Sequence, residues 1–227
     1  MKKGNTRRWV RIGVLSVVIL AVFVLSIQFL PGRKGTEEED IQLPYVVEEA
    51  GVEVRECFAS TIPNPDAGDE MGEEIPSLEI MNRSGKYIRH VFLEIKTSDD
   101  LMYEVIVNDL PEEGLVWAFS QENVVWDTED PIVSVKCREV EFGQQDKKLL
   151  DTIQAEEEDL TVTLTNTGTQ DLTNLEVVCR CNFGEQYFGG ISYKYPVASL
   201  PAGETVTIDA VECYMGTAEV VDIRPAG

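Results

Sequence analysis

The sequence predicts an all-β fold in which two tandem β-sandwiches follow one N-terminal transmembrane helix. Three observations lead there: an uncharged apolar run near the N-terminus, a period-two alternation of apolar and polar residues beyond it, and a repeated set of strand and turn motifs. Beyond the apolar run only residues 147–158 could form a helix, and a short one. The expected segments are a basic tail (1–11), a transmembrane helix (12–30), an acidic stalk (31–45), a first sandwich (46–142) and a second sandwich (143–227).

The composition limits the classes of function. The chain has 227 residues, of which 43% are hydrophobic, so it has enough apolar material for a core. It carries 41 acidic against 19 basic residues and a net charge of −22, which argues against nucleic acid as a partner. A single His leaves no route to a His-based triad or a His-rich metal site. We therefore expect no cofactor and no enzymatic activity, with an enzyme carrying an unrecognised site as a minor alternative.

The N-terminal run has the length and the flanks of a membrane anchor. Residues 12–30 carry no charge, and as a helix they would span about 28 Å, close to the hydrocarbon thickness of a bilayer. Five basic residues precede the run and two follow it, which places the N-terminus in the cytoplasm and the rest of the chain outside. A cleaved signal peptide is the alternative, but its apolar region is usually shorter, and no small-x-small site precedes Pro31.

Beyond the acidic stalk, the strand and turn pattern occurs twice. The segment from Leu78 through Asn82 matches the segment that ends at Asn166, and the Leu110-Pro111 turn matches the one at Leu200. Each repeat has the size and the six or seven strands of an immunoglobulin-like sandwich.

The strand 132–142 is expected to close the first sandwich. Its alternation changes phase near Arg138, so we expect a bulge there that lets this one segment serve both cores.

The turn motifs of the second repeat resemble a known class of domains. Asn166-Thr-Gly168, the strand Leu175-Glu-Val177 and the turn from Leu200 through Pro-Ala-Gly to Glu204 are similar to the N-x-G, strand, L-x-A-G-E pattern of bacterial cell-surface immunoglobulin-like domains of the CARDB and FxLYD classes. In the first repeat, residues 112–114 (Glu-Glu-Gly) replace the Ala-Gly-Glu turn. The resemblance implies an immunoglobulin-like fold and a surface location, and it carries over no catalytic residue.

Acidic residues in the first long loop suggest a calcium site. Asp66, Asp69 and Glu70 supply the oxygen ligands that calcium prefers, although their spacing does not reproduce an EF-hand loop. A solvated acidic loop is the alternative.

Three of the five cysteines are disulfide candidates. Cys179 and Cys181 lie two apart and share one face of a strand, and either could pair with Cys213 in an oxidising compartment. Small buried hydrophobic side chains are the alternative role.

Four aromatic residues around a Gly-Gly pair are the candidates for ligand contact: Tyr187, Phe188, Tyr193 and Tyr195. Aromatic rings on a sheet face suit a sugar or protein partner. A packing role is the alternative, because Tyr193 aligns with Tyr103 of the first repeat.

The sequence thus predicts a single-pass protein of the cell membrane whose C-terminal domains act outside the cytoplasm as an interaction or structural module. The expected partners are the membrane and another protein or a cell-envelope polymer, with adhesion as one possible role. An accessory subunit of a membrane or envelope complex is the alternative.

Overall fold

The computed structural model describes residues 40–68 and 72–226, and within them the chain is built from strands with almost no helix. This confirms the all-β class. The predicted tail, transmembrane helix and most of the stalk lie outside the described residues. Within those residues, no helix has the length and apolar character needed to cross a membrane.

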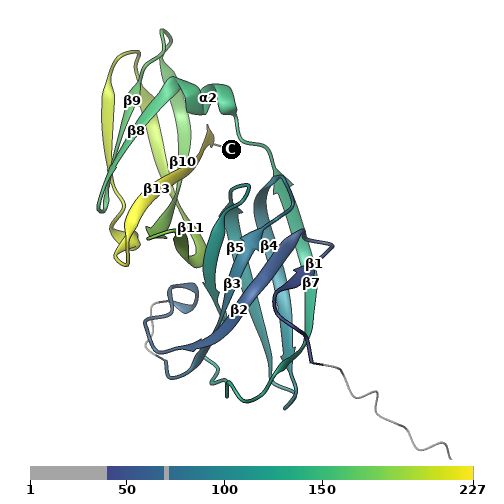
Figure 1. Ribbon diagram of the computed structural model, residues 1–227. Helices are drawn as coiled ribbons and strands as arrows, with labels where there is room; N and C mark the ends of the chain where they lie inside the picture. The colour runs from purple at the N-terminus through teal and green to yellow at the C-terminus, as the bar shows by residue number, and fades with distance from the viewer. Residues whose placement is uncertain (1–39, 69–71, 227) are drawn as a thin grey trace, which may run out of the picture. The chain divides into compact units, whose positions relative to one another are not determined.

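The first half of the described chain, residues 45–143, holds seven strands and one short 3-10 helix (Figure 1). Its elements are β1 (Tyr45–Val47), β2 (Val52–Ser60), η1 (Pro65–Ala67), β3 (Ile75–Asn82), β4 (Tyr87–Thr97), β5 (Met102–Leu110), β6 (Leu115–Phe119) and β7 (Ile132–Gly143). The second half, residues 147–225, holds α2 (Lys147–Thr152), β8 (Ile153–Glu158), β9 (Thr161–Asn166), β10 (Leu172–Phe183), β11 (Gln186–Leu200), β12 (Thr205–Asp209), η2 (Val211–Cys213) and β13 (Thr217–Pro225).

The two halves share one sheet. Seven strands run in the order β1-β2-β3-β6-β11-β10-β13, so this sheet crosses from the first half into the second at β6 and β11. Two further sheets have three strands each, β5-β4-β7 and β12-β9-β8. At the crossing, β11 pairs with β6 in parallel through Tyr187 opposite Val116 and Phe188 opposite Trp117. The described residues, 40–68 and 72–226, consequently belong to a single compact unit. The predicted boundary between residues 142 and 143 stays a prediction.

Two hydrophobic cores lie on opposite faces of the shared sheet. Along β6, Val116 and Ala118 belong to the core of the first half, whereas Phe119 belongs to the core of the second half and Trp117 packs against it. Successive side chains of a strand point to opposite faces. The sheet β5-β4-β7 therefore covers one face at the first half, and β12-β9-β8 covers the other face at the second half.

Two buried asparagines, which the predicted alignment of the repeats matches with each other, make similar hydrogen bonds. The buried side chain of Asn82 donates from Nδ2 to the carbonyl oxygens of Lys86, Leu110 and Pro111, at 2.8, 3.2 and 2.8 Å. The buried Asn166 donates in the same way to Gln170 and Leu200, at 2.8 and 2.9 Å. An amide with two N–H donors suits this position because it satisfies turn carbonyls that are shielded from water.

The predicted helix over 147–158 is only half correct. The carboxylate of Asp146 caps α2 by accepting a hydrogen bond from the backbone N–H of Leu149, at 3.0 Å. The helix ends at Thr152 because Ile153 is extended and pairs with Asn166 as the first residue of β8. Sheet pairing thus takes over after six residues.

The strand at residues 132–142 closes the first half as predicted, but it does not serve both cores. β7 pairs with β4 along its whole length, and the register shifts at Arg138, where the bulge was expected. Val135 lies in the first core, and Cys137 and Val140 pack against that same core. The bulge therefore returns the apolar residues to one core, and β11 is the strand that joins the halves.

Candidate functional site: the junction between the two halves

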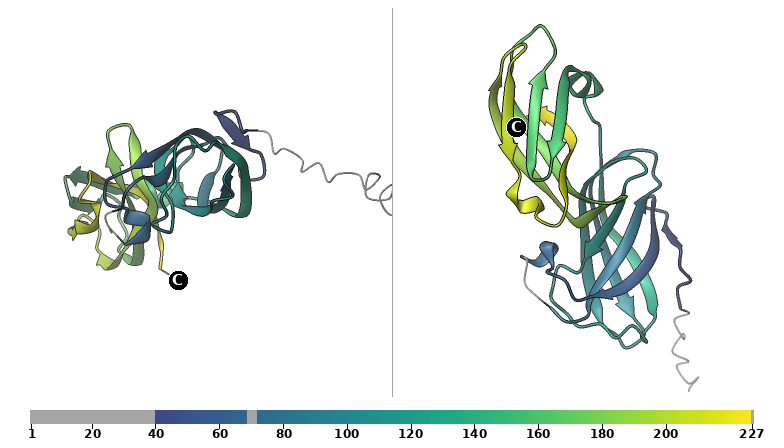
Figure 2. Two further views of the ribbon diagram at one scale, coloured as in Figure 1. Left: turned by 90° about the horizontal axis from the view of Figure 1, so that it is seen from below. Right: turned by 60° about the vertical axis from the view of Figure 1, so that its left-hand side comes forward.

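The junction is the place where η1, β5 and β6 of the first half meet β10, β11 and β13 of the second half. In both views of Figure 2 the short turn η1 lies beside the second half, and η1 contacts β11 and β6. Two networks of charged side chains cross this junction. We name them the Asp66 network and the Asp109 network.

The Asp66 network begins at η1. The side chain of Asn64, which has no exposed surface, accepts a hydrogen bond from the N–H of Asp66 at 3.0 Å and donates to the carbonyl oxygen of Ser120 at 2.9 Å. This fixes η1 against the end of β6. The carboxylate of Asp66 then accepts backbone N–H groups from Phe119 at 2.8 Å, from Gly190 at 2.7 Å and from Ile191 at 3.1 Å. One side chain of the first half thereby holds the backbone of β11.

Arg180 of β10 holds the same backbone from the other side. Its guanidinium has no exposed surface and donates to the carbonyl oxygens of Gly189 and Gly190 in β11 and of Asn108 in β5. The ring of Tyr187 lies 5.1 Å from the guanidinium, in a cation–π contact. The N–H of Gly190 thus donates to Asp66, and the carbonyl oxygen of Gly190 accepts from Arg180. Because Asp66 and Arg180 bind this one peptide segment from its two sides, they fix the position of β11 along β5 and β6.

Gly190 is required by space. A Cβ at this position would lie 1.8 Å from the carbonyl oxygen of Ile106 in β5, so any side chain would force the two strands apart. Gly189 has a φ of +82°, in the left-handed region that favours glycine. The Gly-Gly pair in β11 therefore allows the close backbone approach at which the halves meet.

The Asp109 network lies on the same junction, at the end of β5. Asp109 is 1% exposed and accepts hydrogen bonds from the hydroxyl of Tyr87 at 2.9 Å and from the hydroxyl of Ser192 at 2.7 Å. Arg224 of β13 approaches the same carboxylate at 3.1 Å and Glu176 of β10 at 2.8 Å. Side chains from both halves thus converge on Asp109.

Burial sets the ionisation of these groups. Burial raises the pKa of Asp66 to about 6, although the three backbone donors and Arg180 each lower it. Burial also lowers the pKa of Arg180, and it raises the pKa of Asp222, which lies beside Arg224. The charges of the junction are therefore directed at one another and at the backbone.

The predicted aromatic residues lie at the junction or inside the second half. Tyr187 and Phe188 are 9% and 3% exposed, and Phe188 packs edge-to-face on Phe119 at 5.2 Å. Neither ring is free on a sheet face. Tyr193 and Tyr195 are half-buried against the second core, and the hydroxyl of Tyr195 donates to Glu212 at 2.6 Å. The packing alternative describes Tyr187 and Phe188, and the proposed ligand contact stays a prediction.

The carboxylate of Asp66, predicted as a calcium ligand, contacts backbone N–H groups in the junction. Both of its carboxylate oxygens accept backbone N–H groups, so they are directed away from a cation. Asp69 and Glu70 lie outside the described residues. Within residues 40–68 and 72–226, no group of three or more His, Cys, Asp or Glu side chains is placed to hold a metal ion.

The predicted disulfide candidates lie together in the second core. Cys179, Cys181 and Cys213 are buried, and each is a free thiol, as are Cys57 and Cys137. Burial raises the pKa of Cys57 and of Cys179 to about 12. A thiol with such a pKa is protonated at neutral pH and is a poor nucleophile.

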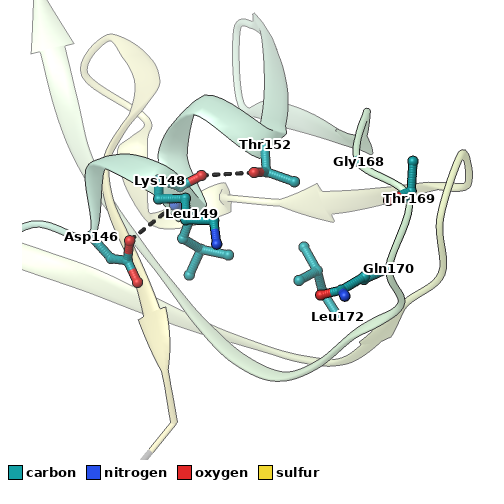
Figure 3. Close-up of a pocket in the computed structure, with 8 residues that line it drawn as sticks. All are labelled: Asp146, Lys148, Leu149, Thr152, Gly168, Thr169, Gln170 and Leu172. Atoms are coloured by element: carbon teal, nitrogen blue, oxygen red, sulfur yellow. Dashed lines mark hydrogen bonds between the residues drawn. The ribbon is translucent and has the colours of Figure 1, made fainter.

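A separate pocket of about 480 Å³ lies at the far end of the second half, between α2 and the loop before β10 (Figure 3). Its polar groups support the helix: Asp146 caps α2, and the hydroxyl of Thr152 donates to the carbonyl oxygen of Lys148 at 2.7 Å. Leu149 and Leu172 provide apolar lining. These contacts are those of a helix end packed on a turn.

The sequence contained two signals for the junction that the pattern analysis did not use. Arg180 interrupts the apolar run 177–181, which marks a charge that must be neutralised inside. The Gly189-Gly190 pair inside a strand pattern marks a close backbone approach. No such signal identifies Asp66 as their partner, because it lies in a loop rich in acids.

No family model matches this chain, and comparison with curated proteins and with solved structures finds no match.

Proposed function

We propose that this chain is a non-catalytic structural or interaction module that two immunoglobulin-like sandwiches form outside the cytoplasm, anchored to the membrane by residues 12–30. The observation that supports this most is the junction. Asp66 and Arg180 fix β11 from both sides, and Asp109 ties β5 to β13. A pair of sandwiches locked in this way is suited to present a surface at a fixed distance from its anchor.

The distribution of charge supports the same proposal. Every one of the 41 acidic residues follows residue 34, so the part beyond the anchor is strongly acidic. Such a surface repels polyanions and favours basic partners. The resemblance of the turn motifs to CARDB and FxLYD domains favours a cell-envelope setting.

Protease treatment of intact cells tests the location. An epitope tag placed after Gly227 should be removed by added protease, while a tag before Met1 should be protected until the membrane is breached. A C-terminal tag that survives on intact cells would refute the proposed orientation.

Cross-linking in intact cells, followed by mass spectrometry, tests the role. Capture of envelope polymer or of varied surface proteins supports an adhesive module. Recovery of one membrane protein in constant proportion supports the accessory-subunit alternative. The variant Arg180→Met is a useful comparison, because a partner that reads the fixed arrangement of the two halves should be lost with the junction.

A further inference from the structure

Three of the five thiols lie close together at the base of the hairpin that β10 and β11 form, which contacts the first half. Cys179 and Cys181 point from one face of β10 into the second core, and Cys213 ends η2. Cys213 has no exposed surface and Cys181 is 3% exposed. Arg180, which lies between the two β10 cysteines, points to the junction.

Within this group, Cys181 is the β10 cysteine that reaches the turn of Cys213. Its thiol donates a hydrogen bond to the carbonyl oxygen of Glu212, the residue before Cys213, at 4.0 Å. The backbone is fixed around them. A Cβ at Gly216 would lie 2.1 Å from the carbonyl oxygen of Asn182, so the loop after η2 lies directly on β10.

We propose that Cys181 and Cys213 form a disulfide bond when the chain folds in the presence of a disulfide oxidant, and that Cys57, Cys137 and Cys179 remain thiols. The thiolate of one cysteine attacks the oxidant, for example oxidised glutathione, and forms a mixed disulfide with release of one glutathione thiol. The second thiolate then displaces the other glutathione. In total the two cysteines lose two protons and two electrons, and the oxidant gains them as two thiols.

The bond forms before the core is complete. In the folded chain, the hydrogen bond with Cys181 and burial raise the pKa of Cys213, so the native thiols exchange slowly. Once made, the bond is shielded from reductant for the same reason. It ties the η2 loop to β10 next to Arg180. The bond thus stabilises the β10–β11 hairpin, which contacts the first half. The chemistry does not depend on the proposed function, because it can be tested in the purified chain.

Peptide mapping identifies the bond without any substitution. The full-length chain, purified in detergent under reducing conditions, is unfolded and refolded in a glutathione redox buffer, alkylated and digested with trypsin. Trypsin cleaves after Arg180 and Lys194, which separates Cys179 from Cys181. The expected product joins the peptide 181–194 to the peptide that begins at Tyr195, with the other three cysteines alkylated. Five alkylated cysteines, or a link from the peptide that ends at Arg180, would overturn the proposal.

Thermal unfolding provides a second readout. The oxidised chain should melt roughly 5–10 °C above the reduced chain. Cys181→Ser and Cys213→Ser should each abolish this difference between oxidised and reduced samples. Cys179→Ser is the matched control in the same core and should keep it. A redox difference that survives in Cys213→Ser would contradict the assignment.

Discussion

The two halves of this protein are alike in what holds each of them together and differ in what joins them. In both, a buried asparagine at the end of a strand ties together the turns at one end of the sheets: Asn82 in the first half and Asn166 in the second. Strand pairing is also the same, since β2-β3-β6 corresponds to β8-β9-β12 and β5-β4-β7 to β11-β10-β13.

The differences lie in two insertions. In the first half, residues 61–74 separate β2 from β3 and carry Asp66, whereas Asp159 and Leu160 alone separate β8 from β9. In the second half, β10 and β11 extend beyond their first-half counterparts, so residues 180–191 replace the short turn 98–101. Every side chain of the Asp66 network that reaches across the junction comes from one of these insertions. The parts that the two halves share stabilise each half, and the inserted parts join the two.

The largest effect is expected from Arg180→Met. The substitution leaves the Asp66 carboxylate and three carbonyl oxygens without their buried partner, so the free energy of unfolding should fall by about 4 kcal/mol. Urea unfolding should be followed by both far-UV circular dichroism and tryptophan fluorescence. Of the three tryptophans, Trp126 lies in the first half, Trp117 lies on β6 against the second core, and Trp9 lies outside the described residues. Fluorescence therefore reports the first half together with the junction, whereas circular dichroism reports all of the strands. The two signals should unfold together in the native chain and separate in the variant.

Arg138→Gln is the matched control. Arg138 pairs with Glu94 at the surface of the first half. An exposed ion pair contributes less than about 1 kcal/mol, so the two unfolding signals should stay together. If Arg180→Met behaves like this control, the Asp66 network does not hold the halves.

The buried asparagines allow the two halves to be compared directly. Asn82→Ala removes three hydrogen bonds to carbonyl oxygens, and Asn166→Ala removes two. Unsatisfied buried carbonyl groups should cost about 3 and about 2 kcal/mol of unfolding free energy, respectively. Urea titration of both variants measures this order. Equal costs, or a greater cost for Asn166→Ala, would show that surrounding packing outweighs the hydrogen bonds.

The pH dependence of stability should report the titration of Asp66, which lies in the insertion of the first half. A carboxyl group whose pKa is raised from 3.8 to about 6 on folding contributes stability that is complete below its unfolded pKa and is lost as the pH rises through about 6. Relative to Asp66→Asn, which cannot titrate, the native chain should lose about 2 kcal/mol between about pH 4 and about pH 8. Thermal melts of both proteins across this range measure the difference. A flat difference would mean that folding leaves the pKa of Asp66 unchanged.

The sequence was sufficient for features that depend on local chemistry. Period-two alternation predicted the strands, and the matched turns predicted that Asn82 and Asn166 are equivalent, because each such pattern is contained in a few neighbouring residues. The bulge at Arg138 was predicted for the same reason, but the core served by the strand was not. Which core a strand joins depends on its pairing partner, and β7 pairs with β4 throughout.

The junction could not be predicted because its partners are far apart in the chain. Asp66 and Gly190 lie in different halves, and their contact follows from the parallel pairing of β6 with β11. An aspartate in an acidic loop has the same local pattern whether it binds solvent, a cation or a backbone. Likewise, the aromatic cluster around Gly189 predicted a contact surface, and its local pattern does not show that Tyr187 and Phe188 are buried where the two halves meet.

The smallest effect is expected from lengthening the covalent connection between the halves. The connection from β7 to α2 is short, and Gln144 in it is exposed. If the junction rather than this connection holds the halves, a Gly-Ser insertion after Gln144 should cost less than about 1 kcal/mol, because lengthening a loop adds little closure entropy. Circular dichroism and fluorescence should still report one transition.

The same insertion after Arg138 interrupts the pairing of β7 with β4 and should lower the fluorescence-detected midpoint strongly. Combined with Arg180→Met, the insertion after Gln144 should separate the two signals further than either change alone, because neither the network nor the short connection would then hold the halves. A large loss from the insertion after Gln144 alone would mean that the connection is itself a structural element and that the two halves are not joined mainly through β6 and β11.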